Sequence, residues 1–380
     1  MHNKIKILFI CGSLEPGKDG VGDYTRRLGC ALIRQGASVA ALALNDYYSN
    51  EAQEAEQDAD GVTIPVLRIP SLWAKAKQTA YAKQWVSQFN PEWISLQFVP
   101  YSFHYKGLPF GLAAQLKALA TPQVKWHIMF HELWLGLREQ DSLKFRCIGT
   151  IQKLLVKSLM TSISFQSIHT HTRFYLNELD KLNLNPIYLP IFSNIPYVKM
   201  ERTEEVGITK TQKFVMFGTI HPKAPITEFA DEIVKYYNNE TGMDCSLVLV
   251  GKSGNEKEQW VQEFKKRKIN VSVLGELSSQ EVSFVLQEAT FGITTNPVFV
   301  LEKSGTVAAM REHNLPILIV AEETKPRDGI HIKLDDDFLH YSFGNLSKLM
   351  EKRSCHSNSK GLNEVSNQFV KDLKNNKIYK

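Results

Sequence analysis

Two stretches of the sequence combine glycine with small polar residues, as anion-binding turns do. Gly12-Ser13 follow an apolar run and lead to Gly20-Val21-Gly22-Asp23-Tyr24, where a helical pattern begins, and Ser304-Gly305-Thr306 precede an Ala-rich helical pattern. Glycine lets a backbone approach a ligand closely, and the amides at a helix start favour a negative charge. We therefore expect an anionic ligand at these turns, and a diphosphate at the second.

Neither of two familiar nucleotide fingerprints is complete. The dinucleotide-binding pattern needs a third glycine three residues after Gly22, where Thr25 stands. Gly251-Lys252-Ser253 resembles the end of a phosphate-binding P-loop, but that motif needs a glycine at Ser246. The sequence therefore does not predict a dinucleotide-dependent oxidoreductase or an ATPase.

Several titratable side chains follow predicted strands. His131 follows the apolar run 124–130, and its ordinary pKa of about 6.5 allows it to act as a base or to hold a hydroxyl group. His169 and His171 alternate near another strand end, but no acidic or cysteine partner nearby completes a metal site. His131 is therefore the candidate for chemistry.

Composition indicates an ordinary globular chain of two domains. The 380 residues are 43% hydrophobic and 22% charged, and the five cysteines are dispersed and predicted to be free thiols. No apolar stretch is long enough to span a membrane, and no cleavage site follows the start, so we expect a cytoplasmic protein. Residues 1–195 hold 20 basic and 15 acidic residues, against 25 of each beyond. This small excess does not suggest nucleic acid, but it suits an acidic acceptor or an anionic membrane.

Short apolar runs alternate with helical patterns, which is typical of parallel sheets covered on both faces. The pattern restarts near residue 214, so we predict a hinge at about 196–210, and the fold class is α/β with two Rossmann-like domains. Residues 51–60, with five carboxylates, are expected to form a solvated loop, and 362–373 a polar helix. The predicted strands are 5–10, 38–44, 93–98, 124–130 and 162–167 in the first half, and 213–217, 246–250, 271–274, 291–294 and 317–320 in the second.

These motifs, in this order, resemble those of GT-B glycosyltransferases, in particular the retaining group 1 (family 4-like) enzymes. The likeness spans about 320 residues and includes the first glycine-rich loop. Its further motifs are Ser95–Tyr101, Phe130–Trp134, Ser193–Pro196, Phe217-Gly218, Val250-Gly251, Leu274–Leu277 and Glu302–Pro316.

The resemblance implies two parallel-sheet domains facing a central cleft and transfer of a sugar from a nucleotide diphosphate sugar to a glycan or lipid-linked acceptor. It implies an acceptor domain over 1–200, a donor domain over 205–345, and a segment 346–380 that crosses back to the first domain. No cofactor is implied. The site residues that we carry over are His131 and Glu302 as catalytic groups; Gly22, Lys223, Gly251, Lys252, Glu276, Lys303, Ser304, Gly305 and Thr306 on the donor side; and Asp23, Tyr24 and Gln97 on the acceptor side.

The sequence departs from the family at two positions. Ala308 stands where the second glutamate of the usual pair is expected, and Thr219 replaces the arginine that neutralises the leaving diphosphate. Lysines then become the candidates for that charge, because cleavage leaves negative charge on phosphate oxygens. No Asp-x-Asp pair appears where a metal-dependent transferase needs one, so we predict a metal-independent reaction whose stereochemistry stays open. A nucleotide-sugar epimerase and a non-catalytic sugar- or protein-binding subunit of the same fold are the alternatives.

A basic amphipathic stretch in the first half is a candidate for peripheral contact with an anionic membrane. Residues 142–159 contain four basic and no acidic residues. A helical wheel places Ile148, Ile151, Leu155 and Leu159 on one side and Arg146, Lys153 and Lys157 on the other. The same pattern also fits a surface helix whose apolar side faces the domain core.

Overall fold

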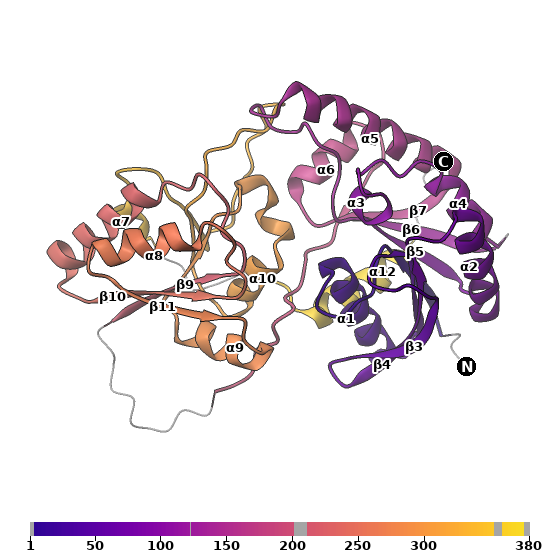
Figure 1. Ribbon diagram of the computed structural model, residues 1–380, viewed down its shortest axis with the longest axis horizontal. Helices are drawn as coiled ribbons and strands as arrows, with labels where there is room; N and C mark the ends of the chain where they lie inside the picture. Colours follow the sequence, from indigo (N-terminus) through magenta and orange to yellow (C-terminus); the bar gives the residue numbers. More distant parts are fainter. Residues whose placement is uncertain (1–3, 122, 201–210, 353–358, 376–380) are drawn as a thin grey trace. The chain divides into compact units, whose positions relative to one another are not determined.

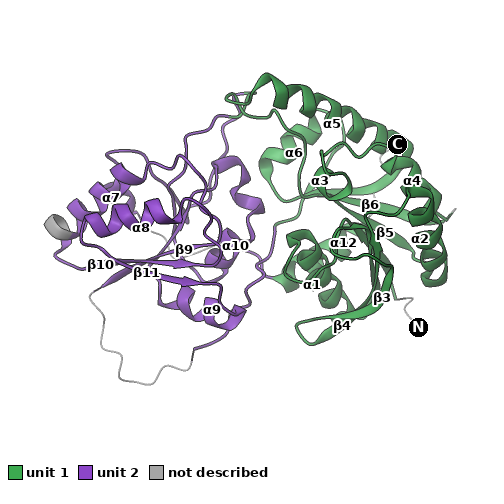
Figure 2. Cartoon of the chain, in the orientation of Figure 1, with its two compact units in different colours: residues 1–190, 326–328, 362–380 green, residues 191–325, 329–361 purple. Residues whose placement is uncertain are grey.

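The chain folds into two compact units. The computed structural model describes residues 4–121, 123–200, 211–352 and 359–375 (Figure 1). Unit 1 comprises Met1–Pro190, Pro326–Asp328 and Leu362–Lys380, and unit 2 comprises Ile191–Lys325 and Gly329–Gly361 (Figure 2). The chain therefore leaves unit 1 before the predicted hinge, and it returns to unit 1 twice.

Unit 1 is built on one twisted, mostly parallel sheet. Its strands are β1 (Lys6–Cys11), β2 (Ser38–Asp46), β3 (Gln53–Ala59), β4 (Val62–Pro70), β5 (Trp93–Phe98), β6 (Lys125–Phe130), β7 (Phe165–Thr170) and β8 (Ile187–Tyr188). Their order is β3-β4-β2-β1-β5-β6-β7-β8, and only the β3–β4 pair is antiparallel among the described strands.

Helices cover both faces of this sheet. On one face lie α1 (Gly20–Arg34) and α12 (Leu362–Lys374), which contact each other. On the other lie α2 (Lys75–Phe89), α4 (Leu112–Leu119) and α5 (Leu143–Ser162) (Figure 1). The short helices α3 (Pro100–Phe103) and α6 (Arg173–Asp180) follow β5 and β7. The predicted C-terminal helix is confirmed, and it belongs to unit 1.

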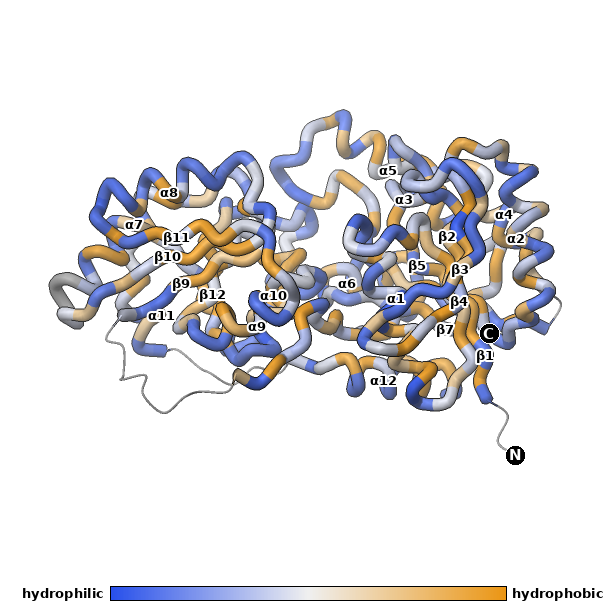
Figure 3. Tube along the Cα trace, turned by 60° about the horizontal axis from the view of Figure 1, so that its bottom comes forward, coloured by the Kyte–Doolittle hydropathy of each residue, from blue (hydrophilic) through white to orange (hydrophobic). Residues whose placement is uncertain are grey.

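Unit 2 has a second, fully parallel sheet. Within the described residues its strands are β9 (Gln212–Phe217), β10 (Cys245–Val250), β11 (Asn270–Gly275), β12 (Phe291–Thr294), β13 (Ile317–Ile319) and β14 (Phe338–His340), in the order β11-β10-β9-β12-β13-β14. Apolar residues follow the strands of both sheets (Figure 3).

Alternate residues of β9 enter two cores, as the two-residue period of a strand requires. Phe214 packs with α7 (Ile226–Lys235) and α8 (Lys257–Lys266) on one face, and Val215 packs with α9 (Ser279–Glu288) and α10 (Gly305–Glu312) on the other. The remaining elements are the π-helix η1 (Tyr236–Thr241), the 3-10 helix η2 (Val298–Lys303) and α11 (Leu346–Glu351).

Two predictions of local structure were wrong. The acidic segment 51–60, predicted as a loop, contains β3, an exposed edge strand held by antiparallel pairing with β4. An edge strand needs no buried side chains, so the acidic composition of this segment gave no sign of a strand. Charged residues are a common feature of such edge strands. The strand predicted at 162–167 begins at Phe165, because α5 continues to Ser162.

The inward side of α5 also differs from the predicted apolar side. Gly149, Gln152, Val156 and Leu159 are the buried residues of the helix, whereas Ile151 is exposed. A Cβ atom on Gly149 would lie 1.8 Å from the Leu135 carbonyl oxygen, so only glycine lets the backbones meet there. Hydropathy alone misplaces the side because a glycine and a hydrogen-bonded glutamine form half of it.

Candidate functional site

Three glycines, Gly218, Gly251 and Gly275, lie at the carboxyl-terminal end of the unit 2 sheet, which we call the glycine edge. Gly218, Gly251 and Gly275 stand at the carboxyl ends of the adjacent strands β9, β10 and β11, with φ angles of +88°, +83° and +68°. Gly251 N donates to the Gly275 carbonyl at 2.6 Å, and Gly218 N donates to Val250 at 2.9 Å. Residues with a side chain rarely adopt these φ angles. Glycine therefore allows the sharp turns here and leaves the backbone open to a ligand.

The edge coincides with the point where the strand order reverses. The chain proceeds outward through β9, β10 and β11 and then returns to place β12 on the other side of β9. The loops after β9 and β12 meet there: His221 N donates to Thr295 Oγ1 at 2.7 Å, and His221 Nε2 lies 3.0 Å from Asn296 Oδ1. Open parallel sheets bind ligands at such switch points.

The predicted helix start lies at the same edge. Ser304 is the N-cap of α10, and its hydroxyl accepts from Val307 N at 3.4 Å. A Cβ atom on Gly218 would lie 2.7 Å from Thr306 Cγ2, so the loop after β9 packs directly on the first turn of α10. The structure thus brings together Gly218, Gly251 and the segment Ser304–Thr306.

The three donor-side lysines predicted from the sequence differ in their exposure to solvent. Lys223, in the left-handed backbone region with φ +63°, makes an ion pair with Glu322 at 3.1 Å, and Lys252 makes one with Glu276 at 3.2 Å. Lys223, Lys252 and Glu276 are exposed, whereas Glu302 and Lys303 are half-buried in η2. Exposed ion pairs of this kind contribute little to stability, so these lysines can exchange a carboxylate partner for a phosphate at low cost.

The first glycine-rich loop has a different local structure from the one expected. Asp19 caps α1, and its carboxylate accepts from Gly22 N at 2.7 Å, so the protein's own carboxylate occupies the helix start. A Cβ atom on Gly22 would lie 2.6 Å from the Ser13 carbonyl oxygen, and Asp23 is paired with Arg26. Close helix packing therefore accounts for Gly22 without a ligand.

Three further candidates meet inside unit 1. His131 Nε2 lies 2.9 Å from Gln97 Oε1, and the ring of Tyr24 packs edge-on against His131 with centroids 5.0 Å apart. All three side chains are buried, and burial raises the pKa of Tyr24, which stays neutral. The second ring nitrogen of His131, Nδ1, lies 3.1 Å from His171 Nε2.

Sequence reasoning missed the extent of this polar cluster. Ser95, His127 and His169 are fully buried on the same face of the sheet, and His127 is hydrogen-bonded to both Ser95 and His169. Burial, with the neighbouring His169 and His131, lowers the pKa of His127 well below its ordinary range. The sequence feature that could have predicted this cluster is the alternation of polar side chains, every second residue, in three strand patterns.

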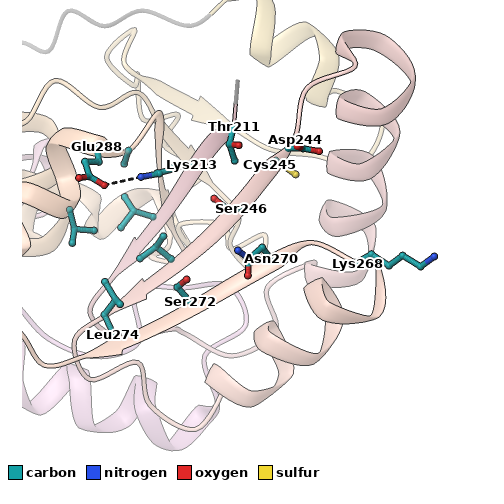
Figure 4. A pocket seen from close by; sticks show the side chains of 14 residues that line it. Thr211, Lys213, Asp244, Cys245, Ser246, Lys268, Asn270, Ser272, Leu274 and Glu288 are labelled. Carbon is teal, nitrogen blue, oxygen red and sulfur yellow. Dashed lines mark hydrogen bonds and ion pairs between the residues drawn. The ribbon is translucent and has the colours of Figure 1, made fainter. Parts of the chain in front are cut away.

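A pocket of about 520 Å³ lies elsewhere in unit 2. It is lined by Lys213 and Glu288, which form an ion pair at 2.8 Å, and by Asp244, Asn270 and Ser272 (Figure 4). Many of its residues come from the beginnings of β9, β10 and β11, away from the glycine edge. None of the predicted donor residues lines it.

Neither a metal-binding cluster nor a membrane-spanning helix occurs among the described residues. Within the part of the chain that the structure describes, no group of three or more His, Cys, Asp and Glu side chains is placed to hold a metal ion. None of the described helices is both long and apolar enough to cross a membrane. The four cysteines among the described residues are free, and Cys355 lies outside them.

Comparison with known proteins identifies the fold. No family model and no curated protein matches the sequence. HepE of Anabaena, solved with UDP and glucose, is 12% identical with a TM-score of 0.57, over 98% of this chain and 100% of its own. WaaG, a glycosyltransferase of lipopolysaccharide biosynthesis, is 11% identical with a TM-score of 0.54, over 97% and 92%.

A protein of Listeria monocytogenes assigned as a UDP-N-acetylglucosamine 2-epimerase is equally similar, at 12% identity and a TM-score of 0.57 over 98% of this chain and 96% of its own. At such identities the likeness shows the fold. The chain has the α/β GT-B fold, with two Rossmann-like units, and the predicted resemblance is confirmed at that level.

Proposed function

We propose that this protein is a glycosyltransferase that takes its sugar from a nucleoside diphosphate sugar bound at the glycine edge of unit 2. The observation that carries the proposal is the meeting of Gly218, Gly251 and the α10 start at the switch point of a parallel sheet. Backbone amides at that edge suit a diphosphate. The glycosyltransferases among the solved structures of the same fold support it.

Uridine and guanosine diphosphate sugars are the donors to test first. In a panel of nucleotide sugars, the true donor should raise the unfolding temperature, since a ligand at about 100 times its dissociation constant adds about 2.7 kcal/mol. Hydrogen exchange should show protection at 217–223, 250–253 and 304–307. Protection confined to residues 4–190 would reject the assignment of the donor site.

An epimerase is the second candidate, favoured by the Listeria structure of the same fold. The two activities differ in their products. A transferase incubated with donor alone should release nucleoside diphosphate slowly and faster with acceptor, whereas an epimerase should convert the sugar without acceptor. If neither product forms, the protein is a non-catalytic binding subunit. The departures Ala308 and Thr219 favour testing that alternative.

The proposed chemistry uses lysines and helix amides in place of a metal ion. Lys223 and Lys252 lie in the loops after β9 and β10, and Ser304 to Thr306 begin α10. Positive charge and backbone N–H groups at that edge would stabilise the leaving diphosphate as the glycosidic bond breaks. His131 and Glu302 stay proposed as the groups nearest the transferred sugar.

We further propose that unit 1 binds a glycan or lipid-linked acceptor and contacts an anionic membrane through the outward side of α5. Leu143, Ile151 and Leu154 are 77%, 39% and 59% exposed. Their spacing, with exposed Cys147 between them, places them on the side opposite the buried Gly149 and Val156.

Basic residues flank this apolar stripe. Lys144 lies on one side of it, and Arg146, Lys153 and Lys157 lie on the other, with Lys153 Nζ 5.1 Å from the centre of the Trp134 ring. A helix with exposed leucines between lysines fits an interfacial orientation. Each basic residue near an anionic surface contributes about 1 kcal/mol, so the group would give appreciable binding.

A further inference from the structure

A continuous chain of hydrogen bonds crosses the buried face of the unit 1 sheet. It begins at the Leu189 carbonyl oxygen, which lies 2.8 Å from His171 Nδ1, and continues from His171 to His131 and Gln97 at 3.1 and 2.9 Å. From Gln97 it passes to Ser95 at 2.7 Å and on to His127 at 2.7 Å.

The chain ends on the C-terminal helix. His127 Nε2 lies 2.9 Å from His169 Nδ1, and His169 Nε2 lies 3.1 Å from Asp372 Oδ2. Asp372 comes from α12, whose Phe369 packs against the rings of His127 and Phe9. Residues more than 200 positions apart in sequence therefore share one buried polar network.

Counting hydrogens shows that the neutral chain is one proton short. Seven hydrogen bonds each require one hydrogen. The bridging groups, four neutral imidazoles, one amide and one hydroxyl, supply one hydrogen each along the chain, which makes six. Both ends, the Leu189 carbonyl and the Asp372 carboxylate, can only accept.

We propose that this chain binds one additional proton, balanced by the Asp372 carboxylate, and that Asp372 is a positioning residue that sets the charge and tautomer of His131. As Gln97 lies, its amide donates to Ser95 and its oxygen faces His131, so the additional proton is held by His131 and His171. Turning the amide over would place that proton on His127 and His169 instead. The proton thus belongs to the chain, as in any strongly coupled set of sites.

Surrounding charges are consistent with this assignment. Tyr24 from α1 faces His131 and His171 and stays neutral, while Lys371 acts on Asp372 from α12. Burial raises the pKa of Asp372, but hydrogen bonds from His169 and Gln368 outweigh this effect and lower it. The charged form of the Asp372 carboxylate is therefore favoured.

The consequence for catalysis rests on the proposed function, whereas the proton count does not. A protonated His131 has no lone pair with which to act as a base, and it would donate to a sugar or phosphate oxygen only where that oxygen replaces Gln97 or His171 as its partner. This distinguishes between the two roles that the sequence left open for it.

Asp372→Asn tests the proposal with an isosteric change. An asparagine amide can donate to His169 Nε2 and so supply the seventh hydrogen. With the Gln97 amide turned over, each of the seven bonds then has one hydrogen, and the additional proton is no longer needed. The matched control is Glu364→Gln, which removes the same charge from an exposed position of the same helix. Histidine ring nitrogen NMR at about pH 8, where a free imidazole is neutral, should show one imidazolium among the four rings in the wild type and control.

The same spectrum should show no imidazolium among these rings in Asp372→Asn. A wild-type spectrum with four neutral rings would overturn the proposal without any variant, and so would an imidazolium that survives in folded Asp372→Asn. A second readout is the pH dependence of kcat/KM. Asp372→Asn should shift it and Glu364→Gln should not, whereas a purely structural role would lower activity equally at every pH.

Discussion

At the scale of single residues, the candidate site depends on groups that already have partners within the protein. Lys223 and Lys252 form ion pairs with glutamates, and Asp19 caps α1. Both ring nitrogens of His131 are hydrogen-bonded. A ligand must therefore exchange with these partners. Exchange is easy for exposed ion pairs and difficult for buried hydrogen bonds.

The lysine hypothesis gives a prediction at this scale. Lys223→Asn removes the charge and keeps a residue that tolerates φ +63°, so a loss of one charge-assisted contact is expected. Turnover should fall by about 10- to 150-fold, which corresponds to about 1.5–3 kcal/mol. Lys268→Asn is the control, because that exposed lysine also has a φ of +62° but precedes β11 at the far end of the sheet.

Transfer rates should be measured in the presence of a chelator. We expect the chelator to leave the wild-type rate unchanged. With chelator present, Lys223→Asn should lower the rate and Lys268→Asn should not. Loss of transfer in chelator with recovery on adding manganese would contradict the metal-independent mechanism.

Gly218 offers a second prediction. Alanine there must adopt φ +88° and meet Thr306 Cγ2, so we expect a cost of about 1–2 kcal/mol for the backbone and about 1–3 kcal/mol for the contact. Gly344→Ala has nearly the same φ of +87° with open space around it, and should show the first cost only. Equal unfolding midpoints for the two variants in urea would show that Gly218 does not hold the α10 start.

At the scale of elements, α5 combines two functions on opposite sides. Its inner side is defined by Gly149 against Leu135 and by Gln152, which accepts from Leu135 N at 2.8 Å and donates to the Gly107 oxygen at 3.0 Å. Because hydrogen bonds and close packing hold this side, the leucines are free to face outward. The exposed stripe is therefore not needed for the fold.

This separation predicts the behaviour of α5 with vesicles. Leu143, Ile151 and Leu154 changed together to Ser should abolish sedimentation with anionic vesicles while the protein stays folded. Leu72→Ser, at a leucine 85% exposed outside α5, should leave it unchanged. Binding should also weaken as salt is raised, through screening of the basic flank. Equal recovery with neutral and anionic vesicles would exclude the charge contribution.

At the scale of the whole molecule, the buried histidines couple stability to pH. The folded state keeps His127 neutral, because its pKa is lowered, whereas the unfolded chain binds a proton there below about pH 6.5. The unfolded state then holds more protons, so stability falls as the pH drops below about 6.5, by up to about 1.4 kcal/mol per pH unit for this histidine. Urea unfolding between about pH 6.5 and 5.5 measures this slope. Stability that rises on acidification would refute it.

Much of the architecture could be predicted from the sequence because it depends on local periodicity. Apolar runs such as 93–98 and 291–294 became strands at those positions, and Ser304 caps α10 where a small polar residue precedes an Ala-rich run. Glycines at strand ends indicated sharp turns, since few other residues adopt their angles. These signals lie within a few residues of one another and need no knowledge of neighbours in space.

Other features were decided only by tertiary contacts. Whether Gly22 is a ligand site or a packing contact depends on Ser13, and the inward side of α5 depends on a carbonyl oxygen from another segment. The histidine chain requires three adjacent strands in register and a helix from the end of the sequence to meet on one face. Hydrogen bonding and backbone approach depend on distances between segments remote in sequence, which periodicity cannot report, so they emerge only when the chain is folded.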